Sequence, residues 1–167
     1  MKISKVLAAL PLVGGVLGKP LESRAVTDFT AYAYGPDGIG GFPVIAIDDI
    51  AYITSDREST ANVAKNVTFN SFTNQGNITA TIPTQGTSLL FVPSESGAVG
   101  FTNTTDDSSQ ITTGFGFYGH VIFVSINGAM TTEWYALPTN TSTLWQLTWN
   151  DESASAIPVA LRNLEPS

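Results

Sequence analysis

The chain of 167 residues contains no cysteine, one histidine and twice as many acidic as basic residues. Its length suits one domain with a core that needs no covalent cross-links, and the missing thiols exclude disulfides, zinc ribbons, iron–sulfur clusters and a cysteine nucleophile. Residues 1–24 contain four of the seven basic residues and one of the 14 acidic residues. The rest of the chain therefore has three basic and thirteen acidic residues, a formal charge of −10. That surface disfavours nucleic acid and anionic lipid as partners.

The N-terminus has the pattern of a secretory signal peptide. Two lysines precede an apolar run from Val6 to Leu17, and small residues follow at Gly18. The run is too short for the roughly 20 residues that cross a bilayer, and no later segment comes close. We therefore expect a signal peptide over 1–18, a short pro-segment over 19–25, one β domain over 26–167, and no membrane insertion. An uncleaved linker is the alternative for 19–25.

From residue 26 onward, apolar residues recur with a period of two, and turn-forming stretches such as GPDGIGG (35–41) separate the segments. The expected strands are residues 26–34, 42–47, 50–54, 66–72, 78–82, 88–92, 98–101, 116–126, 132–137, 144–149 and 157–164. Only residues 56–64 favour a helical turn or two. This spacing predicts an all-β fold of about ten or eleven short strands, either a single antiparallel β-sandwich of jelly-roll type or a barrel.

The stretch TTGFGFYGHVIFVSING, residues 112–128, contains a G-x-G-x-x-G pattern at Gly114, Gly116 and Gly119. A dinucleotide fingerprint requires a helix after its glycines, but a β-branched and aromatic run follows here, so nucleotide binding is not expected. We interpret 116–126 as a central strand covered on both faces, with glycines that leave space for large rings. Phe123→Ala should then cost about 3–5 kcal/mol.

The single histidine, His120, shares parity with Ile122 and Val124. This parity favours a structural histidine at or near the core, with backbone or hydroxyl groups as partners of its ring nitrogens. A general base of a Ser-His-Asp set is the alternative, but the sequence has no G-x-S-x-G elbow.

A glycosidase would need two carboxyl groups roughly 5–9 Å apart, together with aromatic rings for sugar stacking. Glu133 lies beside Trp134 and Tyr135, so these three residues are the candidates for carbohydrate contact and Glu133 is the candidate catalytic acid. The carboxylates that could pair with it are Glu95, Glu152 and Asp28, none at a recognisable spacing. If Trp134 faces inward, Glu133 and Tyr135 face outward, which is also how an ordinary solvated acid would lie.

Two other patterns favour structure over chemistry. Trp145, Leu147 and Trp149 alternate in LWQLTW, which indicates core packing, with a sugar platform as the alternative. Asp48-Asp49 and Asp106-Asp107 could bind calcium, but neither has the ligand series of a known loop, and turns explain both. We therefore expect no metal and no cofactor.

Four N-x-S/T sequons agree with export, at Asn66, Asn77, Asn103 and Asn140. In the segments NVTF and NITATI, alternation places the apolar residues on one face and the asparagines on the other. A glycan at those positions is therefore expected to point to water.

Four segments carry a family resemblance: FTAYAYGPDGIGGFPVIAIDDIAYI (29–53), GFGFYG (114–119), LWQLTWN (144–150) and IPVALRNL (157–164). Together with the N-terminal pattern, they resemble a family of small cysteine-free secreted proteins of filamentous fungi, over nearly the whole mature chain. The family pattern has Asp-Gly at a hairpin where this chain has Asp48-Asp49, so a longer or different loop is expected. The resemblance implies an extracellular β-protein, in some cases an elicitor of plant defence, and no catalytic residues.

Two classes of function are open on the sequence. The first is a secreted, N-glycosylated, non-catalytic fungal protein, either an effector or elicitor or a cell-wall-associated binding module, with a polysaccharide or a host surface protein as its partner. The second is a carbohydrate-active hydrolase built around Glu133. The absence of a convincing catalytic set favours the first.

Overall fold

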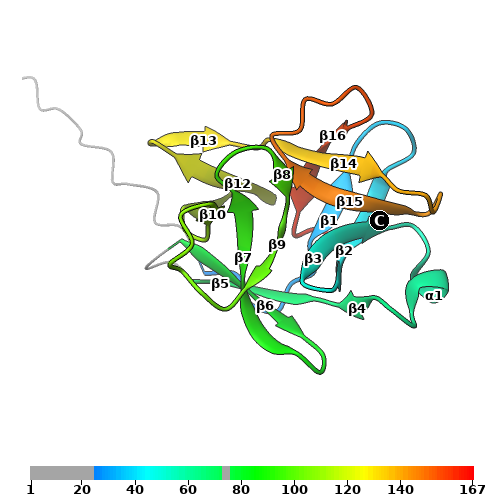
Figure 1. Ribbon diagram of the computed structural model, residues 1–167, viewed down its shortest axis with the longest axis horizontal. Helices are drawn as coiled ribbons and strands as arrows, with labels where there is room; N and C mark the ends of the chain where they lie inside the picture. Colours follow the sequence, from blue (N-terminus) through cyan, green and yellow to red (C-terminus); the bar gives the residue numbers. More distant parts are fainter. Residues whose placement is uncertain (1–24, 73–75) are drawn as a thin grey trace, which may run out of the picture.

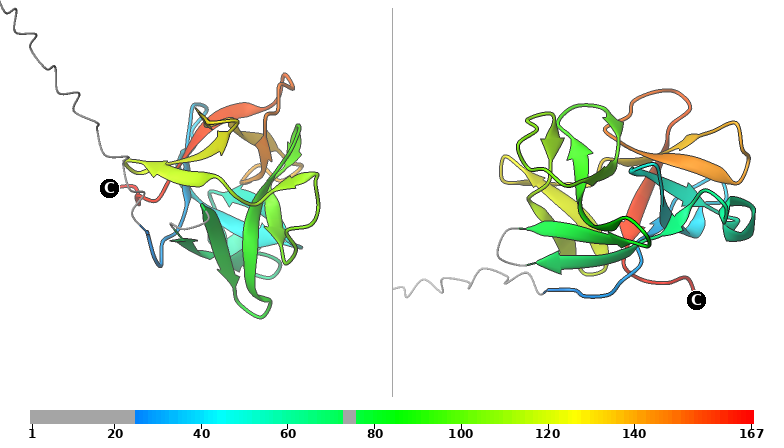
Figure 2. Two further views of the ribbon diagram at one scale, coloured as in Figure 1. Left: turned by 90° about the vertical axis from the view of Figure 1, so that its left-hand side faces the viewer. Right: turned by 60° about the horizontal axis from the view of Figure 1, so that its bottom comes forward.

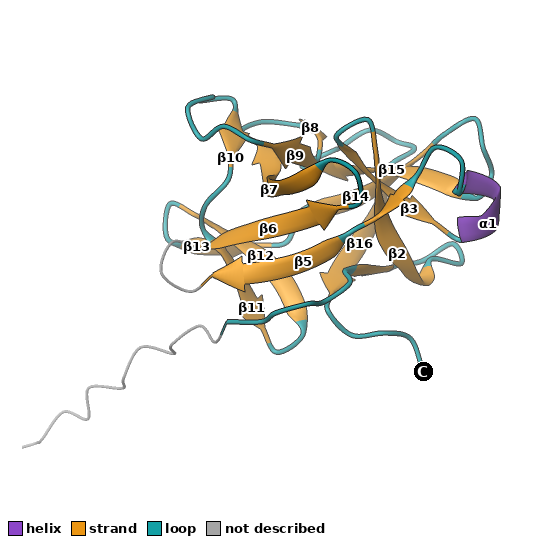
Figure 3. Cartoon of the chain, turned by 90° about the horizontal axis from the view of Figure 1, so that it is seen from below, coloured by secondary structure: helices purple, strands orange, loops and turns teal. Residues whose placement is uncertain are grey.

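The computed structural model describes residues 25–72 and 76–167 (Figure 3). The expected signal peptide (1–18) lies outside the described residues, and so does the expected pro-segment (19–25) apart from Ala25. Strands make up 53% of the described residues and helix 3%. The expectation of an all-β fold is confirmed.

Short antiparallel strands follow one another along the described chain. They are β1 (Tyr32–Tyr34), β2 (Gly40–Ile47), β3 (Ile50–Thr54), β4 (Lys65–Asn66), β5 (Thr68–Phe72), β6 (Asn77–Ile82), β7 (Gly86–Pro93), β8 (Gly97–Ala98), β9 (Gly100–Thr102), β10 (Gln110–Ile111), β11 (Phe115–Tyr118), β12 (Val121–Ile126), β13 (Ala129–Thr131), β14 (Trp134–Pro138), β15 (Leu144–Trp149) and β16 (Ile157–Arg162). The helical turn expected within 56–64 is α1 (Arg57–Thr60), where the Asp56 side chain accepts hydrogen bonds from the backbone N–H groups of Glu58 and Ser59.

Six strands close into an antiparallel barrel in the order β2, β1, β16, β14, β15, β3 and back to β2 (Figure 1). Closure depends on β2, whose first half pairs with β1 and whose second half pairs with β3. Small and large side chains share the interior: Ala33 and Ala136 are fully buried beside Trp134 and Trp149, whose rings meet edge to face at 4.7 Å. The barrel is therefore a packed core.

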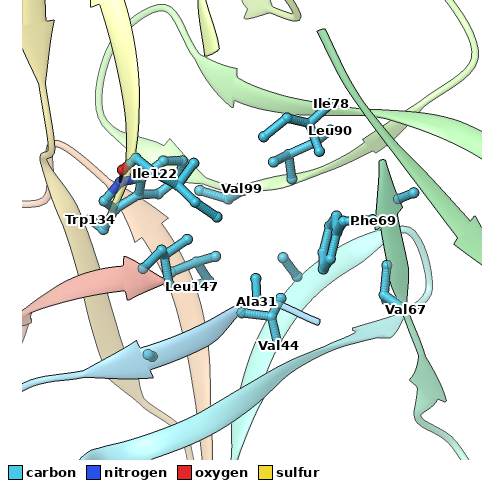
Figure 4. Close-up of a cluster of buried hydrophobic side chains, with 14 of the residues drawn as sticks. Ala31, Val44, Val67, Phe69, Ile78, Leu90, Val99, Ile122, Trp134 and Leu147 are labelled. Atoms are coloured by element: carbon cyan, nitrogen blue, oxygen red, sulfur yellow. Dashed lines mark hydrogen bonds between the residues drawn. The ribbon is translucent and has the colours of Figure 1, made fainter. Parts of the chain in front are cut away.

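Apart from β4, which pairs with β2 next to α1, and β8, which pairs with β15, the remaining strands extend the sheet on the side of the barrel away from α1 (Figures 1 and 2). Strands β5, β6, β7 and β9 form an antiparallel sheet that joins the barrel where β9 meets β3, and β11, β12 and β13 form a meander that joins it where β12 meets β16. Phe69 of β5 stacks on Phe29 and approaches Phe101 of β9. One hydrophobic cluster runs through both parts (Figure 4).

The expected central strand over 116–126 is wrong. The segment is a hairpin, because β11 and β12 pair with each other across a two-residue turn at Gly119-His120. On β12, Ile122 and Val124 are buried in the core and Ile126 packs against it. The prediction failed because the run is apolar at both parities, so parity alone does not say which face is covered. Phe123 is half-buried on the other face, so Phe123→Ala no longer carries the large expected cost.

Gly116 shows why the glycines alternate with rings in this hairpin. It pairs with Phe123 across the hairpin, and a Cβ atom at Gly116 would come within 2.5 Å of the Phe123 ring. The expectation that glycine leaves space for a large ring is confirmed at this position.

The Asp48-Asp49 turn between β2 and β3 is also tighter than expected. Ile47 pairs with Ile50, so the loop has two residues, and their φ angles of 47° and 63° are both in the left-handed region. This is the backbone of a type I′ turn, for which Asn-Gly is the favoured sequence. The longer or different loop expected from the family pattern is therefore not observed.

Asp49→Gly is expected to raise the free energy of unfolding by about 0.5–1 kcal/mol, because it removes left-handed strain and one of two adjacent like charges. Urea denaturation measures the change. Asn127-Gly128 forms the same kind of turn between β12 and β13, with φ angles of 52° and 82° and open space around Gly128. Gly128→Asp is the matched control and should lower the free energy of unfolding by a similar amount. If both variants were as stable as the wild type, left-handed strain would not explain the stability of these turns.

Candidate functional site

The structure separates the three residues proposed for carbohydrate contact. Trp134 is 1% exposed, and its Nε1–H donates a hydrogen bond to the Ile122 carbonyl at 3.0 Å, inside the core (Figure 4). Glu133 is exposed and Tyr135 is half-buried on the outer side of β14. The expectation of an inward Trp134 between two outward neighbours is confirmed, and Trp134 is wrong as a sugar-contact residue because no ligand reaches its ring.

In the part of the chain that the structure describes, His, Asp and Glu residues form no group of three that could hold a metal ion. Hydrogen bonds from Ser109 hold the pKa of Asp107 below its ordinary value, and those from Ser153 do the same for the pKa of Asp151. A general acid requires the opposite shift, so these two carboxylates act as turn-forming groups.

His120 is exposed, not buried. It lies in the β11–β12 turn, its Nδ1 is 2.9 Å from the Asn163 side-chain oxygen, and its carbonyl accepts the Asn163 backbone N–H. The expected place near the core is wrong because the hairpin turn interrupts the parity with Ile122 and Val124. The pair of bonds ties the turn to the end of β16, which supports a structural role.

The LWQLTW segment packs as expected. Leu147 and Trp149 are buried in the barrel, and Trp145 is half-buried at its end, where its ring stacks on Phe42 with 5.8 Å between centroids. These residues belong to the core.

Three of the four sequon asparagines, Asn66, Asn103 and Asn140, are exposed. Asn77 is the exception: it is 9% exposed, and its Oδ1 is buried without a hydrogen-bond partner among the described residues. The expectation that a glycan on Asn77 would point to water is therefore wrong, although Ile78, Ala80 and Ile82 do share the buried face.

A row of side chains crosses strands β11, β12, β16 and β1 on the face of the sheet that points away from the hydrophobic core. Cross-strand partners lie on the same face of an antiparallel sheet. The register pairs Tyr118 of β11 with Val121 of β12, Val121 with Arg162 of β16, and Arg162 with Tyr32 of β1. Their sequence neighbours Ile122, Leu161 and Ala33 enter the core, so the row faces away from it.

Tyr34 and Phe123 share this outward face, since each lies two residues from a member of the row on the same strand. We call Tyr32, Tyr34, Tyr118, Val121, Phe123 and Arg162 the aromatic face. Tyr118 is 72% exposed, and the other five side chains are half-buried. Arg162 is the single charged member.

The half-buried rings of the aromatic face are held in place. The Arg162 guanidinium lies 5.3 Å from the centroid of the Tyr34 ring, and the Tyr34 hydroxyl donates to the Leu164 carbonyl at 2.8 Å. The Arg162 Nε is buried and has no hydrogen-bond partner among the described residues. The Phe123 ring rests on Gly116. A ligand would therefore meet a largely preformed surface.

The aromatic face is absent from the sequence-based expectations, although part of its signal is in the sequence. Tyr32 and Tyr34 alternate with Ala31 and Ala33, so inward alanines imply outward tyrosines. The long-range register that brings Arg162 beside Tyr32, and Tyr118 into the same row, has no local signal.

Comparisons with known proteins give no relative. No family model matches the chain, and neither a curated protein nor a solved structure matches it. Within residues 25–72 and 76–167, no helix is long and apolar enough to cross a membrane.

Proposed function

We propose that the protein is a secreted, N-glycosylated, non-catalytic extracellular protein that binds a cell-wall polysaccharide through its aromatic face. The observation that carries the proposal is the row Tyr118, Val121, Arg162 and Tyr32, whose members lie on one outward face of the sheet. The export pattern at the N-terminus and the exposed sequons support an extracellular location.

The shape of the aromatic face suits an extended sugar chain. Tyr118 and Tyr32 are three strand spacings apart, about 14 Å, which exceeds one sugar ring. Exposed aromatic rings offer apolar surface to the C–H face of a pyranose, and tyrosine hydroxyls and the Arg162 guanidinium offer hydrogen bonds to its hydroxyl groups. Because the rest of the surface is strongly acidic, an uncharged polysaccharide fits better than a polyanion.

On this proposal the protein is a wall-associated binding module. An effector or elicitor role would follow from the polysaccharide that it binds. The alternative, that the aromatic face binds a host surface protein, is distinguished by the test below. The alternative, a hydrolase built around Glu133, places its candidate acid at an exposed position.

The test is a screen of the purified secreted protein against a panel of insoluble and soluble polysaccharides and of host surface proteins, with retention and release of reducing ends as separate readouts. We expect retention on at least one polysaccharide and no release. Glu133→Gln keeps the shape of the side chain and should change neither readout. Release by the wild type that drops by orders of magnitude in Glu133→Gln would overturn the proposal in favour of the hydrolase. Retention only on a host surface protein would overturn the ligand class.

A further inference from the structure

A cleft of about 630 Å³ is lined by residues that do not belong to the aromatic face. Its lining residues come from the β2–β3 hairpin, the segment after α1 and the β14–β15 loop. Tyr52, Leu144 and Val63 supply apolar surface, and Asp48, Asn62 and Asn140 supply polar groups. Its lining therefore combines apolar and hydrogen-bonding surface, as a sugar-binding site does.

Asn140 belongs to a sequon and lines this cleft itself. The loop that carries it is fixed by its own hydrogen bonds: the Thr139 hydroxyl donates to the Leu144 carbonyl at 2.8 Å, the Thr141 N–H donates to the Thr139 hydroxyl at 3.1 Å, and the Leu144 N–H donates to the Thr141 carbonyl at 3.0 Å. The exposed Asn140 side chain is thus presented at the cleft by a well-defined turn.

Val63 adds exposed apolar surface to the cleft beside Asn140. It follows α1 and is 61% exposed, which makes it one of the large apolar side chains that the fold leaves in water. It lines the same cleft as Asn140. A sugar attached to Asn140 would be close enough to cover this apolar surface.

We propose that the first sugars of an N-linked glycan on Asn140 lie in this cleft and form part of the folded protein. The inference rests on the proposed secretion and glycosylation. Attachment joins Nδ2 of Asn140 to C1 of the terminal sugar of an oligosaccharyl diphosphate donor, with loss of one amide proton and departure of the lipid diphosphate. The sugar ring then covers Val63 and Tyr52 with its C–H face, and its hydroxyl groups reach Asp48 and Asn62. Because the sugar is tethered, its effective concentration at the cleft is in the millimolar range and weak contacts suffice.

The experiment uses the full chain secreted from a eukaryotic host that attaches N-glycans, with site occupancy measured by mass spectrometry and Tm by calorimetry. Ser142→Ala removes the sequon but keeps Asn140. Thr105→Ala is the matched control, because it removes the sequon of Asn103, an exposed residue that does not line the cleft. We expect occupied Asn140 in the wild type, a Tm lower by about 2–4 °C in Ser142→Ala, and a change below about 1 °C in Thr105→Ala.

Val63→Ser separates a seated glycan from one that merely protects the surface. It should lower Tm in the glycosylated chain and have little effect in the Ser142→Ala background, because the two sites share one contact. Secretion with unoccupied Asn140 would overturn the inference, and so would equal Tm changes in Ser142→Ala and Thr105→Ala or an additive effect of Val63→Ser. A chain that is not secreted would instead contradict the proposed function, and polysaccharide retention is independent of all these outcomes.

Discussion

Replacing Trp134 with alanine is expected to lower the free energy of unfolding by about 3–5 kcal/mol. The side chain is buried, packs edge to face on Trp149 and donates its indole N–H to the Ile122 carbonyl. Truncation leaves a cavity in the barrel and an unpaired carbonyl on β12. The same side chain links the barrel to the β11–β13 meander, so its loss should weaken both parts together.

Urea denaturation followed by far-ultraviolet circular dichroism measures this loss. Glu133→Ala, at the exposed neighbouring position, is the control and should lie within about 0.5 kcal/mol of the wild type. Trp134→Phe keeps an aromatic ring but not the donor, and should cost about 1–3 kcal/mol. A loss below about 1 kcal/mol for Trp134→Ala would place the side chain at the surface and restore it as a candidate for sugar stacking.

Gly100→Ala is expected to cost about 3 kcal/mol, although it adds a single methyl group. A Cβ atom at Gly100 would lie 2.6 Å from the Asp49 carbonyl oxygen and 2.9 Å from the Phe91 ring. The carbonyl is not free to move, because it accepts the Phe101 backbone N–H at 2.8 Å. Gly100 pairs with Ile50 at the point where β9 joins the barrel, so the added methyl group should force these strands apart.

Gly40→Ala is the matched control for this substitution. Gly40 lies in β2, and its nearest neighbour to an added Cβ is the Gly38 carbonyl oxygen at 4.0 Å. Its stability should change by less than about 0.5 kcal/mol. Equal effects of the two substitutions in thermal denaturation would show that Gly100 is not a steric constraint.

Local patterns predicted much of the fold. The strands expected at 50–54 and 144–149 have these bounds in the structure, because each run of strand-forming residues ends at turn-forming residues on both sides. The Gly119-His120 turn escaped prediction because apolar residues of both parities follow it and hide the break between β11 and β12. Barrel closure had no local signal at all, since it depends on which strands β2 meets along its two halves.

The site was harder to predict than the fold. Sequence neighbours suggested that Glu133, Trp134 and Tyr135 act together, but adjacent residues of a strand point to opposite faces. The residues that do share a face come from four strands, and Tyr118 and Arg162 are far apart in the chain. The burial of Asn77, at the first residue of β6, also went against its parity.

The central claim, that a polysaccharide binds to the aromatic face, is tested most directly by comparing the binding isotherms of Tyr118→Ser and Tyr135→Ser on the polysaccharide that retains the wild type. Both tyrosines lie on outer surfaces of strands, but Tyr118 belongs to the aromatic face and Tyr135 lies beside Glu133. We predict that Tyr118→Ser raises Kd about tenfold or more, while Tyr135→Ser leaves it within about twofold. Unchanged affinity in Tyr118→Ser, or a loss confined to Tyr135→Ser, would contradict the account.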